Sequence, residues 1–374
     1  MLILRFSPAL TLALACSLTA AAQTPPSPQP TVQAAVVATR NQAPPPDQQK
    51  PSAITTNLSA PRERTLRQLG MVDIPGSPGF DEVAIANGKV LLTHTSDSSL
   101  EVVDPVRRRV VARIINLQSP RGIAVDPANQ KVYVAQAGNS TIAAIAFEGW
   151  KVTNIIPVPQ PPTALQLDDS GRRLFWASAQ SNTLSIMDLS TRQNTGTIDL
   201  AGRPRGMAWD QERGVVFITL QDTAEVVAVD PKLQIVSRFK LNGAQPTEIV
   251  YDARTRHLYI AVRQAVLAIS DENGSESSRV EAPIGVDGLW FDPESRTLYA
   301  ASPGQLTVIR TTDGSLTALD KIPCDIKGHN IAYDHDSNIL FLPGGREGRS
   351  EMLLLQPTSS ESANGKEDVA ARVK

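Results

Sequence analysis

Short apolar runs separated by polar turn-forming clusters recur along the chain about every ten residues. In the stretch 172–210 the apolar runs are LFWA, LSIM, TIDL and GMAW. Runs of this length, bounded by Gly, Pro, Asn, Asp and Ser, predict successive antiparallel strands rather than helices.

The strand pattern repeats with a nearly fixed period. Pro120, Pro162, Pro204 and Pro246 are 42 residues apart, and so are Asp126, Asp168, Asp210 and Asp252. A step of 40 residues leads to Asp292, and a further 42 to Asp334. A period of this length that holds four short strands predicts a β-propeller.

Seven segments match the first, innermost strand of the repeat. They are residues 82–86, 122–126, 164–168, 206–210, 248–252, 288–292 and 330–334. No fourth strand follows the last repeat at 352–357, whereas the segment 66–74 has the fourth-strand pattern. We therefore predict an all-β fold, a seven-bladed propeller of four-stranded antiparallel blades. An N-terminal strand completes the last blade and removes an open sheet edge.

Repeated Asp and Gly residues have structural explanations. The Asp that ends each of six inner strands is followed by a polar cluster, as in DPANQ and DPESR, and Asp side chains readily begin turns. Gly122, Gly206 and Gly288 open inner strands, where we expect backbones to approach each other closely near the axis.

The chain divides into four regions. Residues 1–22 match a signal peptide, 23–64 form a Pro-rich linker expected to be disordered, 65–357 the propeller, and 358–374 a disordered tail. The apolar run near the N-terminus is too short for a transmembrane span. We expect an exported protein, periplasmic or extracellular. Attachment of a lipid at Cys16 is the alternative, and without Cys16 only Cys324 remains, so no internal disulfide forms.

Charge and composition limit the classes of binding partner that the protein is expected to have. The chain has 36 Lys plus Arg against 38 Asp plus Glu, with no basic stripe, which argues against nucleic acid. The four His are scattered, and no nucleotide, metal or nucleophile motif is present. We expect no cofactor, no metal, and a monomer that binds an unidentified protein, peptide, cell-wall component or small polar ligand.

Several segments are similar to a known family of repeats. VYVAQAGNSTIAAI with SPRGIAVDP, and LFWASAQSNTLSIMDLST with GRPRGMAWD, resemble the YVTN-repeat propellers, also called YncE-like. The resemblance covers roughly residues 65–357 and weakens in the first and last repeats. It implies a seven-bladed propeller, frequently exported, with binding or surface roles. It supplies no catalytic residues.

Candidate chemistry gathers at the rim where the chain enters the inner strands. The candidate ligand-binding residues there are Asp81, Glu82, His94, Arg121, Arg205, Glu248, Asp287, His329 and Arg346. Arg121 and Arg205 would suit a carboxylate or phosphate. The Gly-rich stretch 344–350 is expected to form the longest loop of this rim. The alternative is that these charges pair with one another and keep the rim soluble.

Three functions remain open at this point. The first is a non-catalytic exported scaffold that binds through the channel-mouth rim. The second is a lactonase-like hydrolase, which in a metal-bound form needs converging carboxylates, such as Glu82 with Glu248 or Asp287. The third is a structural cell-surface or adhesion role, which the Pro-rich linker favours.

Overall fold

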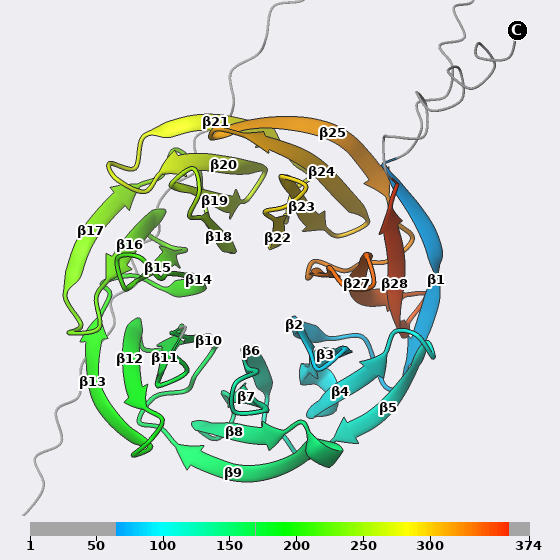
Figure 1. The fold of residues 1–374 in the computed structure, drawn as a ribbon, viewed down its shortest axis with the longest axis horizontal. Coiled ribbons are helices and arrows are strands. Elements are labelled where there is room, and N and C mark those ends of the chain that lie inside the picture. The colour runs from blue at the N-terminus through cyan, green and yellow to red at the C-terminus, as the bar shows by residue number, and fades with distance from the viewer. Residues whose placement is uncertain (1–64, 169, 359–374) are drawn as a thin grey trace, which may run out of the picture. The chain divides into compact units, whose positions relative to one another are not determined.

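In the computed structural model, residues 65–168 and 170–358 are described, and they form seven four-stranded antiparallel sheets around a ring (Figure 1). The predicted seven-bladed propeller is therefore confirmed. The predicted signal peptide, Cys16 and the linker lie outside the described residues, and only Thr358 of the predicted tail is described.

The first four blades follow one another along the chain. Blade 1 consists of β2 (Phe80–Ala86), β3 (Lys89–His94), β4 (Ser99–Asp104) and β5 (Arg109–Ile114). Blade 2 consists of β6 (Pro120–Asp126), β7 (Lys131–Gln136), β8 (Thr141–Ala146) and β9 (Lys151–Pro157). Blade 3 consists of β10 (Ala164–Leu167), β11 (Arg173–Ser178), β12 (Thr183–Asp188) and β13 (Gln193–Asp199). Blade 4 consists of β14 (Pro204–Asp210), β15 (Val215–Leu220), β16 (Glu225–Val229) and β17 (Ile235–Lys240).

The remaining blades complete the ring. Blade 5 consists of β18 (Ile249–Asp252), β19 (His257–Val262), β20 (Ala265–Ser270) and β21 (Glu276–Glu281). Blade 6 consists of β22 (Gly288–Asp292), β23 (Thr297–Ser302), β24 (Gln305–Thr312) and β25 (Ser315–Pro323). Blade 7 consists of β26 (Ala332–Asp334), β27 (Ile339–Arg346), β28 (Arg349–Pro357) and β1 (Leu66–Ile74). Two short 3₁₀ helices, η1 (Thr95–Asp97) and η2 (Glu148–Trp150), lie in the connections.

The ring is closed by the first strand of the described chain. In Figure 1 the blue β1 lies beside the red β28, and the two strands pair antiparallel from Leu66↔Pro357 to Ile74↔Ser350. The Thr358 N–H donates to the Thr65 carbonyl at 2.9 Å and extends this pairing by one step. The N-terminal strand thus completes blade 7, as the sequence predicts, and the outer edge of β28 is covered.

Each sheet is buried on both faces, which explains its almost continuous apolar strands. The neighbouring residues Phe175 and Trp176 on β11 are both fully buried. Trp176 packs in a cluster with residues of blade 2, and Phe175 packs in another cluster with residues of blade 4. The hydrophobic core is therefore a series of interfaces between blades, and each blade depends on its two neighbours.

Glycines near the axis allow the inner strands to approach one another. A Cβ on Gly122 would lie 2.8 Å from the Cα of Ala164, and one on Gly288 would lie 2.4 Å from the His329 carbonyl oxygen. Both distances are shorter than real Cβ contacts. The prediction that close approach requires glycine at these positions is confirmed.

The predicted long loop over 344–350 is wrong. β27 and β28 stay paired through Gly345↔Ser350 and Arg346↔Arg349, so that only Glu347 and Gly348 form the turn. Gly344 is extended, and a Cβ there would lie 2.6 Å from the Gly328 nitrogen. Close backbone packing, not mobility, accounts for this glycine.

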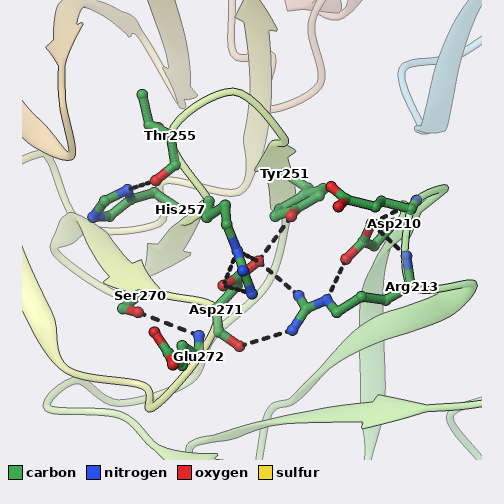
Figure 2. Close-up of polar contacts among 10 residues, drawn as sticks. Asp210, Arg213, Tyr251, Thr255, His257, Ser270, Asp271 and Glu272 are labelled. Atoms are coloured by element: carbon green, nitrogen blue, oxygen red, sulfur yellow. Dashed lines mark hydrogen bonds and ion pairs between the residues drawn. The ribbon is translucent and has the colours of Figure 1, made fainter.

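The aspartates that end the inner strands begin turns as predicted, and Asp210 also joins its blade to the next. The Oδ1 of Asp126 accepts the Asn129 N–H at 3.1 Å, and other aspartates of the series do the same. Figure 2 shows Arg213 reaching from Asp210 in blade 4 to Asp271 in blade 5. The buried Asp271 carboxylate also accepts the Tyr251 hydroxyl at 2.8 Å. These contacts link blades 4 and 5 on the rim opposite the inner-strand entries.

Candidate functional site

The first residues of the seven inner strands surround one end of the central channel. Counting four residues back from Ala86 in blade 1, and from the turn-forming aspartate of each other blade (Asp126, Asp168, Asp210, Asp252, Asp292 and Asp334), gives equivalent positions. They are Glu82, Gly122, Ala164, Gly206, Glu248, Gly288 and Asn330. We call this the second mouth position. The residues just before them form the first mouth position: Asp81, Arg121, Thr163, Arg205, Thr247, Asp287 and His329.

Backbone hydrogen bonds between blades hold the mouth in place. The N–H groups of Gly122, Gly206 and Gly288 donate to the carbonyls of the first mouth position in the next blade, at 3.2, 2.9 and 2.6 Å. The Asn330 side-chain amide of blade 7 donates to the Asp81 carbonyl of blade 1. Because these bonds are between blades, the mouth side chains are presented from a fixed ring.

The mouth encloses a cavity of about 300 Å³. It is lined by residues of all seven blades, among them six of the predicted site residues: Asp81, Glu82, Arg205, Glu248, Asp287 and His329. The second mouth position is Gly or Ala in four blades, which leaves the space open. A Cβ on Gly206 would lie 2.7 Å from the Thr247 carbonyl oxygen and 2.8 Å from the Oε1 of Glu248, so this glycine accommodates both the neighbouring backbone and that carboxylate.

Two acidic residues of the mouth already have basic partners. Arg121 Nη1 lies 2.6 Å from the Oδ1 of Asp81. The Oδ2 of Asp287 lies 3.2 Å from His329 Nδ1 and 3.7 Å from Arg205 Nη2. Burial raises the pKa of Asp287, but His329 and Arg205 outweigh it and hold that pKa below its ordinary value. The same contact with Asp287 raises the pKa of His329.

The two glutamates of the second mouth position have no such partner. Within residues 65–168 and 170–358, neither Glu82 nor Glu248 forms an ion pair with a basic side chain. Burial, followed by repulsion from Asp287, raises the pKa of Glu248 to about 7. The Ile249 N–H, which donates to its Oε1 at 3.1 Å, and the more distant Arg205 oppose this rise but do not cancel it. Burial, and then repulsion from Glu248, Asp81 and Asp287, raises the pKa of Glu82 well above its ordinary value.

The other predicted site residues lie elsewhere. Arg121 is beside the cavity, where it engages Asp81. His94 is fully buried at the end of β3, with Nδ1 3.3 Å from Glu101 Oε1 and Nε2 2.6 Å from the Ser77 carbonyl oxygen. Arg346 forms an ion pair with Glu351 across the β27–β28 hairpin. His94 and Arg346 do not line the cavity, because each is held by a carboxylate of its own blade.

A second hollow adjoins the cavity on the side of blades 4 to 6. It has a volume of about 360 Å³ and shares Arg205, Thr247 and Asp287 with the mouth. Its further lining residues are Gln221, Gln245, Arg263, Ile284, Gly285 and Val286. We call this hollow the side groove. Of its residues the site prediction includes only Arg205 and Asp287, because most of the others come from loops whose sequences do not repeat.

Neither a cluster of metal ligands nor a membrane-spanning helix is found in the described part of the chain. No group of three or more His, Cys, Asp or Glu side chains there is arranged to hold a metal ion. No helix there is long and apolar enough to cross a membrane.

Comparison with known proteins supports the fold. No family model matches the chain, and no curated protein does. Among solved structures, a chain of hydrazine synthase from Kuenenia stuttgartiensis is similar with a TM-score of 0.65 at 13% identity, over 77% of this chain and 97% of that one. A functionally unknown protein from Desulfotomaculum acetoxidans is similar with a TM-score of 0.62 at 12% identity, over 69% of this chain and 89% of that one. Likeness at this level of identity shows the fold alone, and the chain is a seven-bladed β-propeller.

Proposed function

We propose that the protein is a binding scaffold that takes a cationic, amine-bearing ligand into the channel mouth. The observation that carries the proposal is the pair of glutamates, Glu82 and Glu248, which line the cavity and form no ion pair with a basic side chain among the described residues. Arg205 lines the same cavity but faces Asp287 and attracts Glu248 only from beyond ion-pair distance. A ligand ammonium placed between them supplies the missing positive charge. It also meets the mouth in a partly desolvated space, where charge-assisted hydrogen bonds are stronger than in water.

An anionic ligand is disfavoured by the same geometry. Arg121 and Arg205, which by sequence would suit a carboxylate or phosphate, already face Asp81 and Asp287. An anion in the mouth would have to displace those carboxylates and approach Glu82 and Glu248 as well. We therefore propose a cationic ligand instead of the carboxylate or phosphate that the arginines suggest from sequence.

The test is isothermal titration calorimetry with n-butylamine, and with n-butanol as the uncharged probe. We expect butylamine to bind and butanol not to bind. The double variant Glu82→Gln, Glu248→Gln should lose at least about ten-fold in affinity for butylamine, because a ten-fold change needs only about 1.4 kcal/mol. Glu212→Gln is the matched control, since Glu212 is exposed on the opposite rim and forms no ion pair among the described residues. Equal binding of butylamine to the wild-type protein and the double variant would refute the proposal.

A hydrolase of the lactonase type is the second candidate. It is favoured by Glu248, whose pKa of about 7 is suited to a general base in a solvent-accessible cavity. The check is hydrolysis of simple γ- and δ-lactones, monitored by acid release, with wild-type protein and Glu248→Gln. Turnover that is lost in the variant would establish the hydrolase, and absence of turnover across the series would leave the binding role.

We also propose that the protein is exported and belongs with the YVTN-repeat propellers. The support is the N-terminal signal pattern over 1–22 and the repeated P-x-G-I-A-like and VYVA-like segments. Mass spectrometry of the mature N-terminus tests the export. Cleavage before Gln23 supports a freely exported protein, an acylated Cys16 supports a lipid anchor, and an intact Met1 contradicts both.

A further inference from the structure

The side groove places a free positive charge next to the acidic mouth. Arg263 lines the groove, is exposed, and forms no ion pair within the described ranges. Its backbone is fixed at both ends, since its N–H donates to the Ala244 carbonyl at 2.9 Å and its carbonyl accepts the Gly285 N–H at 3.0 Å. The guanidinium is therefore carried by an anchored backbone and is available to a ligand.

The rest of the groove suits a short peptide. Ile284 is 63% exposed beside Arg263 and offers an apolar surface. The side chains of Gln221 and Gln245 supply amide donors and acceptors of the kind that recognise peptide groups. Arg205 and Asp287 line both hollows, so a ligand that leaves the mouth in this direction enters the groove directly.

We infer that the mouth and the side groove together form one site for a short peptide with a lysine-type ammonium and a free carboxylate. The inference rests on the proposed function, which assigns the ammonium to Glu82 and Glu248. It adds the carboxylate, which Arg263 receives, and an apolar side chain, which Ile284 contacts. Opposite charges in the two hollows select a dipolar ligand over a simple cation or a simple anion.

The experiment compares peptides that differ only at the C-terminus. The probes are N-acetylated Lys-Leu, Lys-Gly-Leu and Lys-Gly-Gly-Leu, each with a free carboxylate or as the C-terminal amide, and n-butylamine as the simple cation. We expect at least one free-carboxylate peptide to bind about ten-fold more tightly than its amide, because a hydrogen bond to a charged group contributes roughly 1.5–3 kcal/mol. Arg263→Gln should remove this preference, so that each carboxylate peptide and its amide bind the variant equally.

Arg254→Gln serves as the matched control, because Arg254 is exposed on the opposite rim and forms no ion pair among the described residues. If butylamine binds but carboxylate and amide peptides bind equally in every pair, the peptide site is refuted and the proposed function stands. A preference that survives Arg263→Gln also refutes the assignment to Arg263. If butylamine itself fails to bind, the proposed function is refuted, whatever the peptides do.

Discussion

At the scale of single residues, the second mouth position has a packing role in some blades and carries a carboxylate in others. Four blades carry Gly or Ala there, and in Gly122 and Gly288 the absence of a side chain permits close approach of two backbones. Blades 1 and 5 carry Glu82 and Glu248 instead, and both side chains occupy space that the small residues leave. A carboxylate that is partly desolvated beside other carboxylates resists ionisation, so these two residues are not chosen for stability.

We predict that the effect of Glu248→Gln on the free energy of unfolding depends on pH. The pKa of Glu248 in the folded protein is raised to about 7 from its ordinary value of 4.5, so the folded state holds an extra proton between these values. The contribution of this proton to the free energy of unfolding is fully present below the ordinary pKa of 4.5 and is lost as pH rises through about 7. Glu248→Gln should therefore become more stable than wild type by roughly 1–3 kcal/mol near pH 8, and by much less near pH 5.

Urea unfolding at the two pH values measures the difference, with Glu212→Gln as the control that should not change with pH. A variant whose stability relative to wild type is the same at both pH values would contradict the raised pKa.

The two glutamates could be singled out from sequence once the repeats were aligned, because they are acidic at a position where most other blades carry a small residue. Their lack of ion-paired basic side chains could not be predicted from sequence. Arg121 and Arg205 belong to the same ring of residues, and only the fold shows which acids they face.

At the scale of elements, the turns on the opposite rim hold neighbouring blades together. Arg213 connects Asp210 of blade 4 to Asp271 of blade 5. Arg213 and Asp271 are 58 residues apart in the sequence. The repeat predicted Asp210 as a turn former, which is correct. It gave no indication of Asp271, because the equivalent positions in blades 2 and 3 carry Phe147 and Leu189 instead of an acid.

We predict that Asp271→Asn destabilises the protein by roughly 1.5–3 kcal/mol, the range for losing hydrogen bonds to a buried charged group. Asp271 is 1% exposed and accepts from Arg213, Arg256 and Tyr251. The loss is limited because solvent reaches both arginines and Arg213 keeps its contact with Asp210. Thermal unfolding measures the effect. Glu272→Gln, at an exposed position in the next residue, should change stability by less than about 0.5 kcal/mol. Equal melting temperatures for Asp271→Asn and wild type would show that the contact between blades 4 and 5 does not matter.

At the scale of the whole molecule, ring closure depends on the N-terminal strand. The number of blades, the strand order and the β1–β28 pairing followed from the repeat and from the strand missing after 352–357. The hairpin at 344–350 did not follow, because a Gly-rich sequence is typical both of mobile loops and of closely packed strands. The β27–β28 pairing and the close approach of Gly344 to the backbone of Gly328 decide between them.

Deletion of residues 65–75 should leave β28 as an open edge. The buried Leu66, Val72 and Ile74 would also be lost from clusters that join blade 7 to its neighbours. We expect loss of cooperative thermal unfolding, or aggregation, by circular dichroism and light scattering. Addition of a synthetic 65–75 peptide should restore a cooperative transition, whereas a scrambled peptide should not. A deletion variant that melts like wild type would show that β1 does not close the ring.

The central claim is that the mouth receives a cation between two glutamates, and proton release on binding tests it most directly. A ligand ammonium favours the ionised form of Glu248, whose pKa is about 7, so binding should expel a proton near neutral pH. Calorimetric titration of n-butylamine in two buffers of different ionisation enthalpy measures that proton. We expect release of a fraction of a proton near pH 7 and tighter binding near pH 8 than near pH 6. Both effects should be absent in the double variant Glu82→Gln, Glu248→Gln. Binding with no proton release, or weaker binding as pH rises, would contradict it.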